Sequence, residues 1–180
     1  MWDLEMTRLD SKKLEAAIHY ICAVASQTGI ELDPIKLNKV LWYSDSYAYL
    51  VRGTSITGSR YIRKPYGPVA KYNQIAIENL SRNNSVATGK TNTGGVWQKR
   101  VDSIASADTS AFDAFELNTF DAMVKKVGEQ MTSRDVSDRT HGEIWELASD
   151  GDDIPLYTVF AESARNPSPE KMALAHQGLM

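Results

Sequence analysis

The segment "DPIKLNKVLWYSDSYAYLVRG", residues 33–53, is the stretch from which the fold can be deduced most directly. Asp33 followed by Pro34 is a typical helix start, because aspartate caps free backbone N–H groups and proline fits the first helical position. Gly53 is a typical residue at a helix end. The segment therefore predicts a helix over residues 34–52.

The apolar residues of this predicted helix cover more than one of its sides. One stripe repeats at helical spacing and consists of Leu37, Val40, Leu41, Ser44, Tyr47, Ala48 and Val51. Trp42 and Tyr49 fall together on a different side, next to Asp45. A helix that is apolar on more than one side is usually central and buried. The alternative is that Trp42 and Tyr49 are aromatic anchors for a protein partner, because aromatic residues dominate interface hot spots.

The composition is that of an ordinary globular protein, with 42% hydrophobic and 24% charged residues in a chain of 180. A chain of this size can bury a core without disulfide or metal cross-links. The single cysteine, Cys22, excludes an internal disulfide framework and favours a reducing compartment. The sequence shows neither a secretory signal nor an apolar run long enough for a membrane span. We therefore expect a cytoplasmic protein that does not insert into a membrane.

The rest of the chain also favours helices, with one clear exception. Helical spacing predicts helices over residues 11–28 and about 115–131, and a short helix from Ser133. Two β-leaning runs around a Gly/Thr/Asn-rich loop predict a hairpin over residues 85–104. The expected fold is mainly α (α+β): a single helical domain with a small antiparallel β hairpin or sheet. Its expected bounds are residues 1–165, followed by a tail, residues 166–180, that is either a short helix or a frayed terminus.

The stretch "YIRKPYGPVAKYNQ", residues 61–74, combines a rigid turn with positive charge. We predict a structural role for Gly67 and Pro68, in which Pro68 is the first residue of a helix. The buried stripe of that helix would be Val69, Tyr72, Ile75, Ala76 and Leu80. Architecture does not account for the cations beside the turn. We expect the turn to present four residues to a partner, since a rigid turn lowers the ordering cost of binding: Arg60, Arg63, Lys64 and Tyr66.

The charges are distributed unevenly along the chain. Residues 34–77 contain seven cations and one anion and carry +6, so that the remainder of this chain of net charge −3 carries −9. The two parts could neutralise each other within one fold. Alternatively, the basic segment 34–77 could serve a nucleic-acid-binding regulator. An overall pI of about 5.6 argues against that alternative. So does the connection from Arg52 to Pro68, which is far longer than the turn of a helix-turn-helix.

The sequence predicts no catalytic, cofactor-binding or metal-binding residues. The three histidines are scattered and match no zinc-binding spacing. The string "TGKTNTGG" lacks the upstream glycine of a phosphate-binding loop and lies in the predicted hairpin. We therefore expect a protein that is not an enzyme and uses no cofactor, and a cryptic enzyme is the weaker alternative.

Three pieces of the sequence resemble the Panacea domain of SocA-like antitoxins, and together they span residues 9–160. The first matches a basic helix with aromatic residues, here Lys36, Leu37, Lys39, Leu41, Trp42 and Tyr43. The second matches a Tyr-Gly-Pro-Val element, here Tyr66, Gly67, Pro68 and Val69. The third matches a Thr-His…Trp element, here Thr140, His141 and Trp145. The longer hairpin and the tail depart from the family pattern.

The resemblance implies a non-enzymatic, mainly helical antitoxin of a bacterial or prophage toxin–antitoxin system. Such a protein neutralises a cognate toxin, expected from a neighbouring gene, by direct binding. Some SocA-like members are thought to act as proteolytic adaptors that hand the toxin to a AAA+ protease. We expect His141 and Trp145 to be a packing and hydrogen-bonding scaffold.

Overall fold

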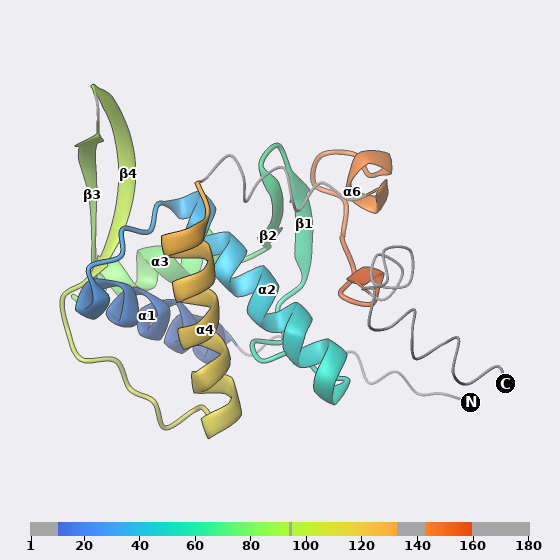
Figure 1. Ribbon diagram of the computed structural model, residues 1–180, viewed down its shortest axis with the longest axis horizontal. Helices are drawn as coiled ribbons and strands as arrows, with labels where there is room; N and C mark the ends of the chain where they lie inside the picture. The colour runs from blue at the N-terminus through green and yellow to red at the C-terminus, as the bar shows by residue number, and fades with distance from the viewer. Residues whose placement is uncertain (1–10, 94, 133–142, 160–180) are drawn as a thin grey trace, which may run out of the picture.

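The computed structural model describes residues 11–93, 95–132 and 143–159. Its helices are α1 (Ser11–Thr28), α2 (Pro34–Arg52), α3 (Asn73–Arg82), α4 (Ala114–Gln130) and α6 (Glu143–Leu147). Its strands are β1 (Tyr61–Lys64), β2 (Gly67–Ala70), β3 (Val86–Thr93) and β4 (Val96–Ser103), which form two antiparallel two-stranded sheets. The predicted mainly α fold with a small β component is confirmed. In Figure 1, α1, α2 and α4 occupy the centre, and the two sheets lie at separate places around them.

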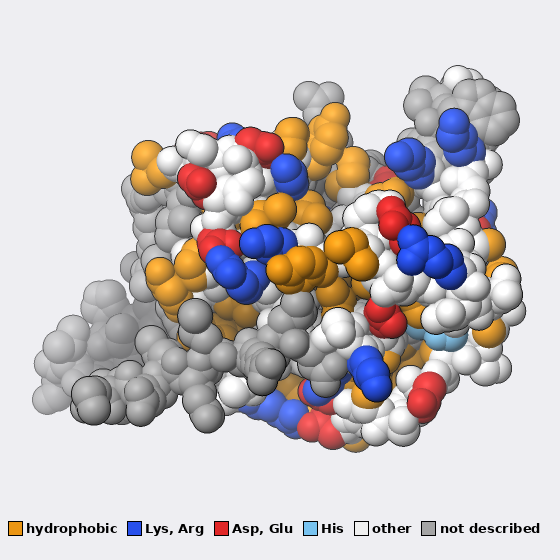
Figure 2. Space-filling view, turned by 180° about the vertical axis from the view of Figure 1, so that it is seen from behind, with side chains coloured by type: hydrophobic (Ala, Val, Ile, Leu, Met, Phe, Trp, Pro, Cys, Tyr) orange, Lys and Arg blue, Asp and Glu red, His pale blue; other side chains and the backbone are white. Residues whose placement is uncertain are grey.

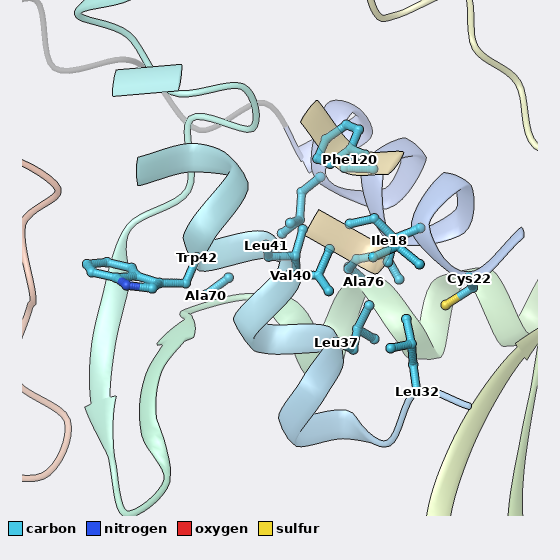
Figure 3. Packing of buried hydrophobic residues seen from close by; sticks show 14 of the residues in the cluster. Ile18, Cys22, Leu32, Leu37, Val40, Leu41, Trp42, Ala70, Ala76 and Phe120 are labelled. Atoms are coloured by element: carbon cyan, nitrogen blue, oxygen red, sulfur yellow. The ribbon is translucent and has the colours of Figure 1, made fainter. Parts of the chain in front are cut away.

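Helix α2 is central, as its sequence predicts. The Asp33 carboxylate accepts a hydrogen bond of 2.8 Å from the Lys36 N–H, and Gly53 ends the helix with φ 76°. The predicted bounds of α2 are confirmed. They could be predicted because the residues that end the helix lie next to it in the sequence. The helix contacts α4 and β2 and also touches α1 and β4. Figure 3 shows Leu37, Val40 and Leu41 pointing into the cluster that also holds Ile18 of α1 and Phe120 of α4.

Helices α1 and α4 complete this core. The predicted bounds of α1 are confirmed, and α4 begins one residue before the predicted start. That start is set by a capping box, in which Asp113 and Glu116 each accept a hydrogen bond from the other's backbone N–H. Phe120, Val124 and Val127 of α4 are buried on the side that faces the core.

Strands β1 and β2 correct the prediction for Pro68. This residue lies in β2, opposite Arg63, and no helix begins there. Gly67 has φ 101°, which a residue with a side chain rarely adopts. Pro68 is tolerated because β2 is at the edge of its sheet, where a missing N–H breaks no ladder bond.

Helix α3 consequently starts later than predicted and turns a different face inward. It begins at Asn73, and its buried residues are Asn73, Ala76, Ile77 and Leu80. The predicted inward residues Tyr72 and Ile75 are 40% and 55% exposed. The error in the start shifted the helical phase, so only part of the predicted stripe is correct.

Strands β3 and β4 form the predicted hairpin, with Val86 paired with Ser103 at its base and Thr93 paired with Val96 at its far end. Val86 and Val101 are buried at the base. Contacts with α3 and α1 attach the hairpin to the body, and from there it projects outward (Figure 1).

Some predictions fall outside the part of the chain that the structure describes. These concern the short helix from Ser133, His141, and the tail 166–180. The segment around Tyr157, which the sequence left open between strand and helix, starts a helical turn at Thr158. None of the described helices combines the length and apolarity that a membrane crossing requires.

Candidate functional site

A buried carboxylate organises the loop that leads from α2 into β1. Asp45 is fully buried and accepts hydrogen bonds of 2.9 Å from the backbone N–H groups of Ile56 and Thr57. The hydroxyl of Tyr61 donates to it at 2.8 Å, and the hydroxyl of Thr57 donates to it at 2.5 Å. Burial raises the pKa of the Asp45 carboxyl, and these four donors oppose that shift. The arrangement holds the start of β1 rigidly on α2.

Sequence reasoning did not identify this cluster. The signal that could have revealed it is Asp45 itself, a charged residue that lies beside Trp42 and Tyr49 in the helical spacing. A fully buried carboxylate needs several donors, and the loop that follows the helix is the nearest source of free backbone N–H groups.

Trp42 lies in the core and does not offer a surface to a partner. Its side chain is 6% exposed, and its ring meets that of Tyr61 edge-on, with centroids 4.9 Å apart. Figure 3 shows it pointing from α2 toward β1. Tyr49 is half-buried and packs against the same core. The interpretation of α2 as a central helix is confirmed for most of its predicted apolar stripe, whereas Tyr47 and Val51 of that stripe are 44% and 55% exposed. The alternative in which Trp42 is an exposed anchor is wrong, because β1 covers that side of α2.

The cations beside the turn face an acidic segment from the far end of the chain. Arg60 forms an ion pair with Asp153, and the Lys64 Nζ lies 3.1 Å from a carboxylate oxygen of Asp150. The Arg63 side chain instead contacts Trp145. Its guanidinium carbon is 4.2 Å from the indole centroid, and its Nε donates to the Trp145 carbonyl at 3.0 Å.

Backbone hydrogen bonds fasten the same acidic segment to β1. The Arg63 N–H donates to the Asp152 carbonyl at 2.8 Å, and the Gly151 N–H donates to the Arg63 carbonyl at 3.0 Å. The Ile154 N–H donates to the Tyr61 carbonyl at 2.7 Å. Residues 151–154 therefore cover the outer edge of β1 in the manner of a short third strand.

These contacts favour one of the two interpretations of the uneven charge. The cations of residues 60–64 face the acids of residues 150–153, so the two parts do neutralise each other here. Elsewhere in the basic segment, Arg52 pairs with Asp113 at 2.6 Å, and the Lys36 Nζ donates to the Gly128 carbonyl. Most of segment 34–77 is thus not a free basic patch.

We call four residues the β1–β2 turn surface: Arg60, which directly precedes β1, Arg63 and Lys64 of β1, and Tyr66 of the connection to β2. Tyr66 is the most prominent, because its side chain is 61% exposed. Gly67 and Pro68 are buried directly behind it. Trp42 belongs to the core of the molecule, and the half-buried Tyr49 packs against that core.

Lys39 is an unusual residue that sequence reasoning did not single out. It is 1% exposed, and its Nζ has no hydrogen-bond partner among the residues that the structure describes. Burial lowers the pKa of its ammonium group to about 7. Lys39 lies one turn before Trp42, and therefore on the side of α2 that β1 covers.

The comparison with known families agrees with this arrangement. The family model described as "Antitoxin SocA-like, Panacea domain" matches residues 37–146, which is more than half of the chain. The match begins in α2 and ends in α6, so it includes the Asp45 cluster and the β1–β2 turn surface. No curated protein and no solved structure shows a significant match to the chain. The chain therefore belongs to the family of SocA-like antitoxins with a Panacea domain.

Proposed function

We propose that this protein neutralises a cognate toxin by direct protein–protein contact, and that the β1–β2 turn surface is part of the contact. The observation that carries the proposal is the exposure of Tyr66, at 61%, on a turn that is held rigidly from behind. The Asp45 hydrogen bonds and residues 151–154 hold β1 on both sides. A tyrosine on such a support loses little freedom on binding and is a frequent hot-spot residue.

The cations of this surface have unequal roles in the proposed contact. The side chains of Arg60 and Lys64 are 60% and 41% exposed within their ion pairs. Exposed ion pairs contribute only up to about 1 kcal/mol, so an acidic group of a toxin can replace the internal partner at little cost. Arg63 stacks on Trp145 and is the least available. We therefore expect Tyr66 to be the anchor and Arg60 and Lys64 to be peripheral contacts.

The first experiment is co-expression with the product of the neighbouring gene. We expect that product to stop growth when it is expressed alone, to be harmless in the presence of this protein, and to co-purify with it. A neighbour that is harmless or does not bind would contradict the assignment of the neighbouring product as the toxin.

A pair of tyrosine variants then tests the surface. Tyr66→Ala should raise the dissociation constant for the toxin at least tenfold, since a hot-spot side chain contributes about 2 kcal/mol or more. Tyr157→Ala is the matched control, because its side chain is 59% exposed and lies outside this surface. Both variants should keep the wild-type melting temperature. Full neutralisation by Tyr66→Ala would overturn the surface assignment and leave the antitoxin role intact.

A second mechanism within the same function is delivery of the toxin to a AAA+ protease, which rests on the resemblance to adaptor members of the family. The half-life of the toxin in cells distinguishes it from simple blocking. Delivery predicts that co-expression shortens the half-life of the toxin and that loss of the protease restores toxicity. Blocking predicts a half-life that is unchanged or longer.

A further inference from the structure

The β3–β4 hairpin, residues 86–103, takes no part in the proposed toxin contact, and we call it the arm. It projects from the body and is attached at its base by Val86 and Val101 (Figure 1). Eight residue pairs join its strands, so at about 3.4 Å per residue it is about 27 Å long. Neither strand pairs with a third strand among the described residues.

The outer part of the arm is cationic and contains no acid. Between Ala87 and Val101 the charged residues are Lys90, Lys99 and Arg100. Arg100 is neutralised, because it pairs with Glu31 at 3.1 Å and with Asp102 at 2.5 Å. Lys90 and Lys99 are exposed and form no ion pair with a described residue. Figure 2 shows cationic side chains at its upper right, where the arm projects.

The two lysines are direct neighbours across the arm. Lys90 lies opposite Lys99 in the strand register. Like charges in directly opposite positions destabilise a strand pair, so this arrangement works against folding of the arm. An external polyanion would remove the repulsion, which gives the lysine pair a physical reason to be present.

The shape of the arm indicates which polyanion fits. The sequence of β3, "VATGKTNT", consists of small residues apart from Lys90 and Asn92, whereas β4, "VWQKRVDS", adds the larger Trp97 and Gln98. The arm is a two-stranded antiparallel ribbon, an element that the major groove of B-form DNA, about 12 Å wide, admits. The major groove of A-form RNA is too narrow for protein side chains to enter. We propose that the arm inserts into the major groove of duplex DNA, with Lys90 and Lys99 contacting the flanking phosphates.

The test is fluorescence anisotropy of the whole protein with a mixed-sequence DNA duplex of two turns, about 20 base pairs. Binding is measured from about 50 to 200 mM salt, because the slope of log affinity against log salt is about −0.9 per phosphate contact. The double variant Lys90→Gln/Lys99→Gln loses two phosphate contacts. Its slope of log affinity against log salt should therefore be less steep by about 1.8. Lys90→Glu with Lys99→Glu should weaken binding at least tenfold at the lowest salt.

The matched control carries Lys71→Glu and Lys125→Glu. Both lysines are exposed and lie outside the arm, so this variant has the same net charge as the glutamate variant of the arm. We expect it to bind DNA within about twofold of the wild type. An equal loss in both variants would show a general effect of net charge and would overturn the proposal. The melting temperature should not fall in the glutamine variant, because it removes the repulsion between the two lysines. It should stay near the wild-type value in the glutamate variant, where repulsion between two carboxylates replaces repulsion between two ammonium groups.

Two further ligands separate DNA from other partners. A double-stranded RNA of the same length should bind more weakly, and equal affinity would overturn insertion into the major groove. Poly-glutamate at the same concentration of charge should compete poorly with DNA. If it competes equally well, the arm recognises acidic proteins and the DNA proposal is wrong. The toxin pull-down does not depend on the arm, so either proposal can fail alone.

Discussion

Both sheets of this protein are antiparallel pairs of strands, but they differ in how they contact the rest of the molecule. Strands β1 and β2 are short, lie against α2, and have their outer edge covered by residues 151–154. Their cations face carboxylates. Strands β3 and β4 are twice as long, are attached only near their base, and place Lys90 opposite Lys99. The comparison shows that one hairpin is part of the scaffold, whereas the other extends from it.

The largest effect should come from removing the support beneath β1. Asp45→Ala leaves the buried donors of Thr57 and Tyr61 and the Ile56 N–H without an acceptor. Each buried donor left without an acceptor costs about 1–3 kcal/mol, so we expect the free energy of unfolding to decrease by about 3–5 kcal/mol. Chemical denaturation measures it, with the exposed Glu129→Ala as a control within about 0.5 kcal/mol. A loss below 1 kcal/mol would contradict the role of Asp45.

The second effect concerns Lys39, on the same side of α2. Its pKa is lowered to about 7 in the folded protein from 10.5, so the folded state resists protonation. The contribution of Lys39 to stability should therefore be greatest above pH 10.5, decrease as the pH falls from 10.5 to 7, and change no further below pH 7. Lys39→Met removes the buried ammonium and should raise the free energy of unfolding at pH 6 by up to about 4 kcal/mol.

The pH profile of that variant provides its own control. The difference between Lys39→Met and the wild type should shrink between pH 7 and pH 10, where both folded proteins carry a neutral side chain. A difference that does not change with pH would mean that packing, and not charge, separates the two proteins.

A third effect on the free energy of unfolding, of intermediate size, should follow from weakening the contacts between β1 and the segment that contains Trp145. Trp145→Ala removes the ring beneath the Arg63 guanidinium and the indole N–H that donates to the Lys64 carbonyl at 3.2 Å. We expect a loss of about 2 kcal/mol and faster proteolysis within residues 143–159. Trp145→Phe keeps an aromatic face and loses only the donor, so its loss should be about half as large. Equal losses would indicate that the cation–ring contact contributes nothing.

The smallest effect should have the opposite sign and occur in the arm. Lys99→Glu converts the pair with Lys90 into an attractive one and should raise the free energy of unfolding by about 0.2–1 kcal/mol. Lys125→Glu, on the exposed side of α4, should change it by less than about 0.5 kcal/mol. Destabilisation by Lys99→Glu would show that repulsion between the lysines is not a cost of this arm.

The helices were predictable because their signals are local. Asp33, Pro34 and Gly53 define the ends of α2 without help from the rest of the fold. The hairpin over 86–103 was predictable for a similar reason, since two β-leaning runs flank a glycine-rich loop. The buried stripes of α1 and α4 followed from helical spacing, which reports the face that turns inward.

Pro68 was misplaced because its local signals fit two structures. A proline after glycine suits the first position of a helix and also an edge strand. The choice depends on the partner strand β1 and on the surface of α2, which a local pattern does not contain. Once the start of α3 was misplaced, the phase of its buried face was wrong as well.

The sequence by itself determined the central helix, the hairpin and the resemblance to SocA-like antitoxins, because caps, spacing and short motifs act over a few residues. Only the tertiary structure decided that Trp42 is buried and that the cations of β1 face carboxylates about 90 residues away. The same is true of the four donors on Asp45. Burial and charge pairing depend on which distant segments meet, and that is settled by the packing of the whole chain.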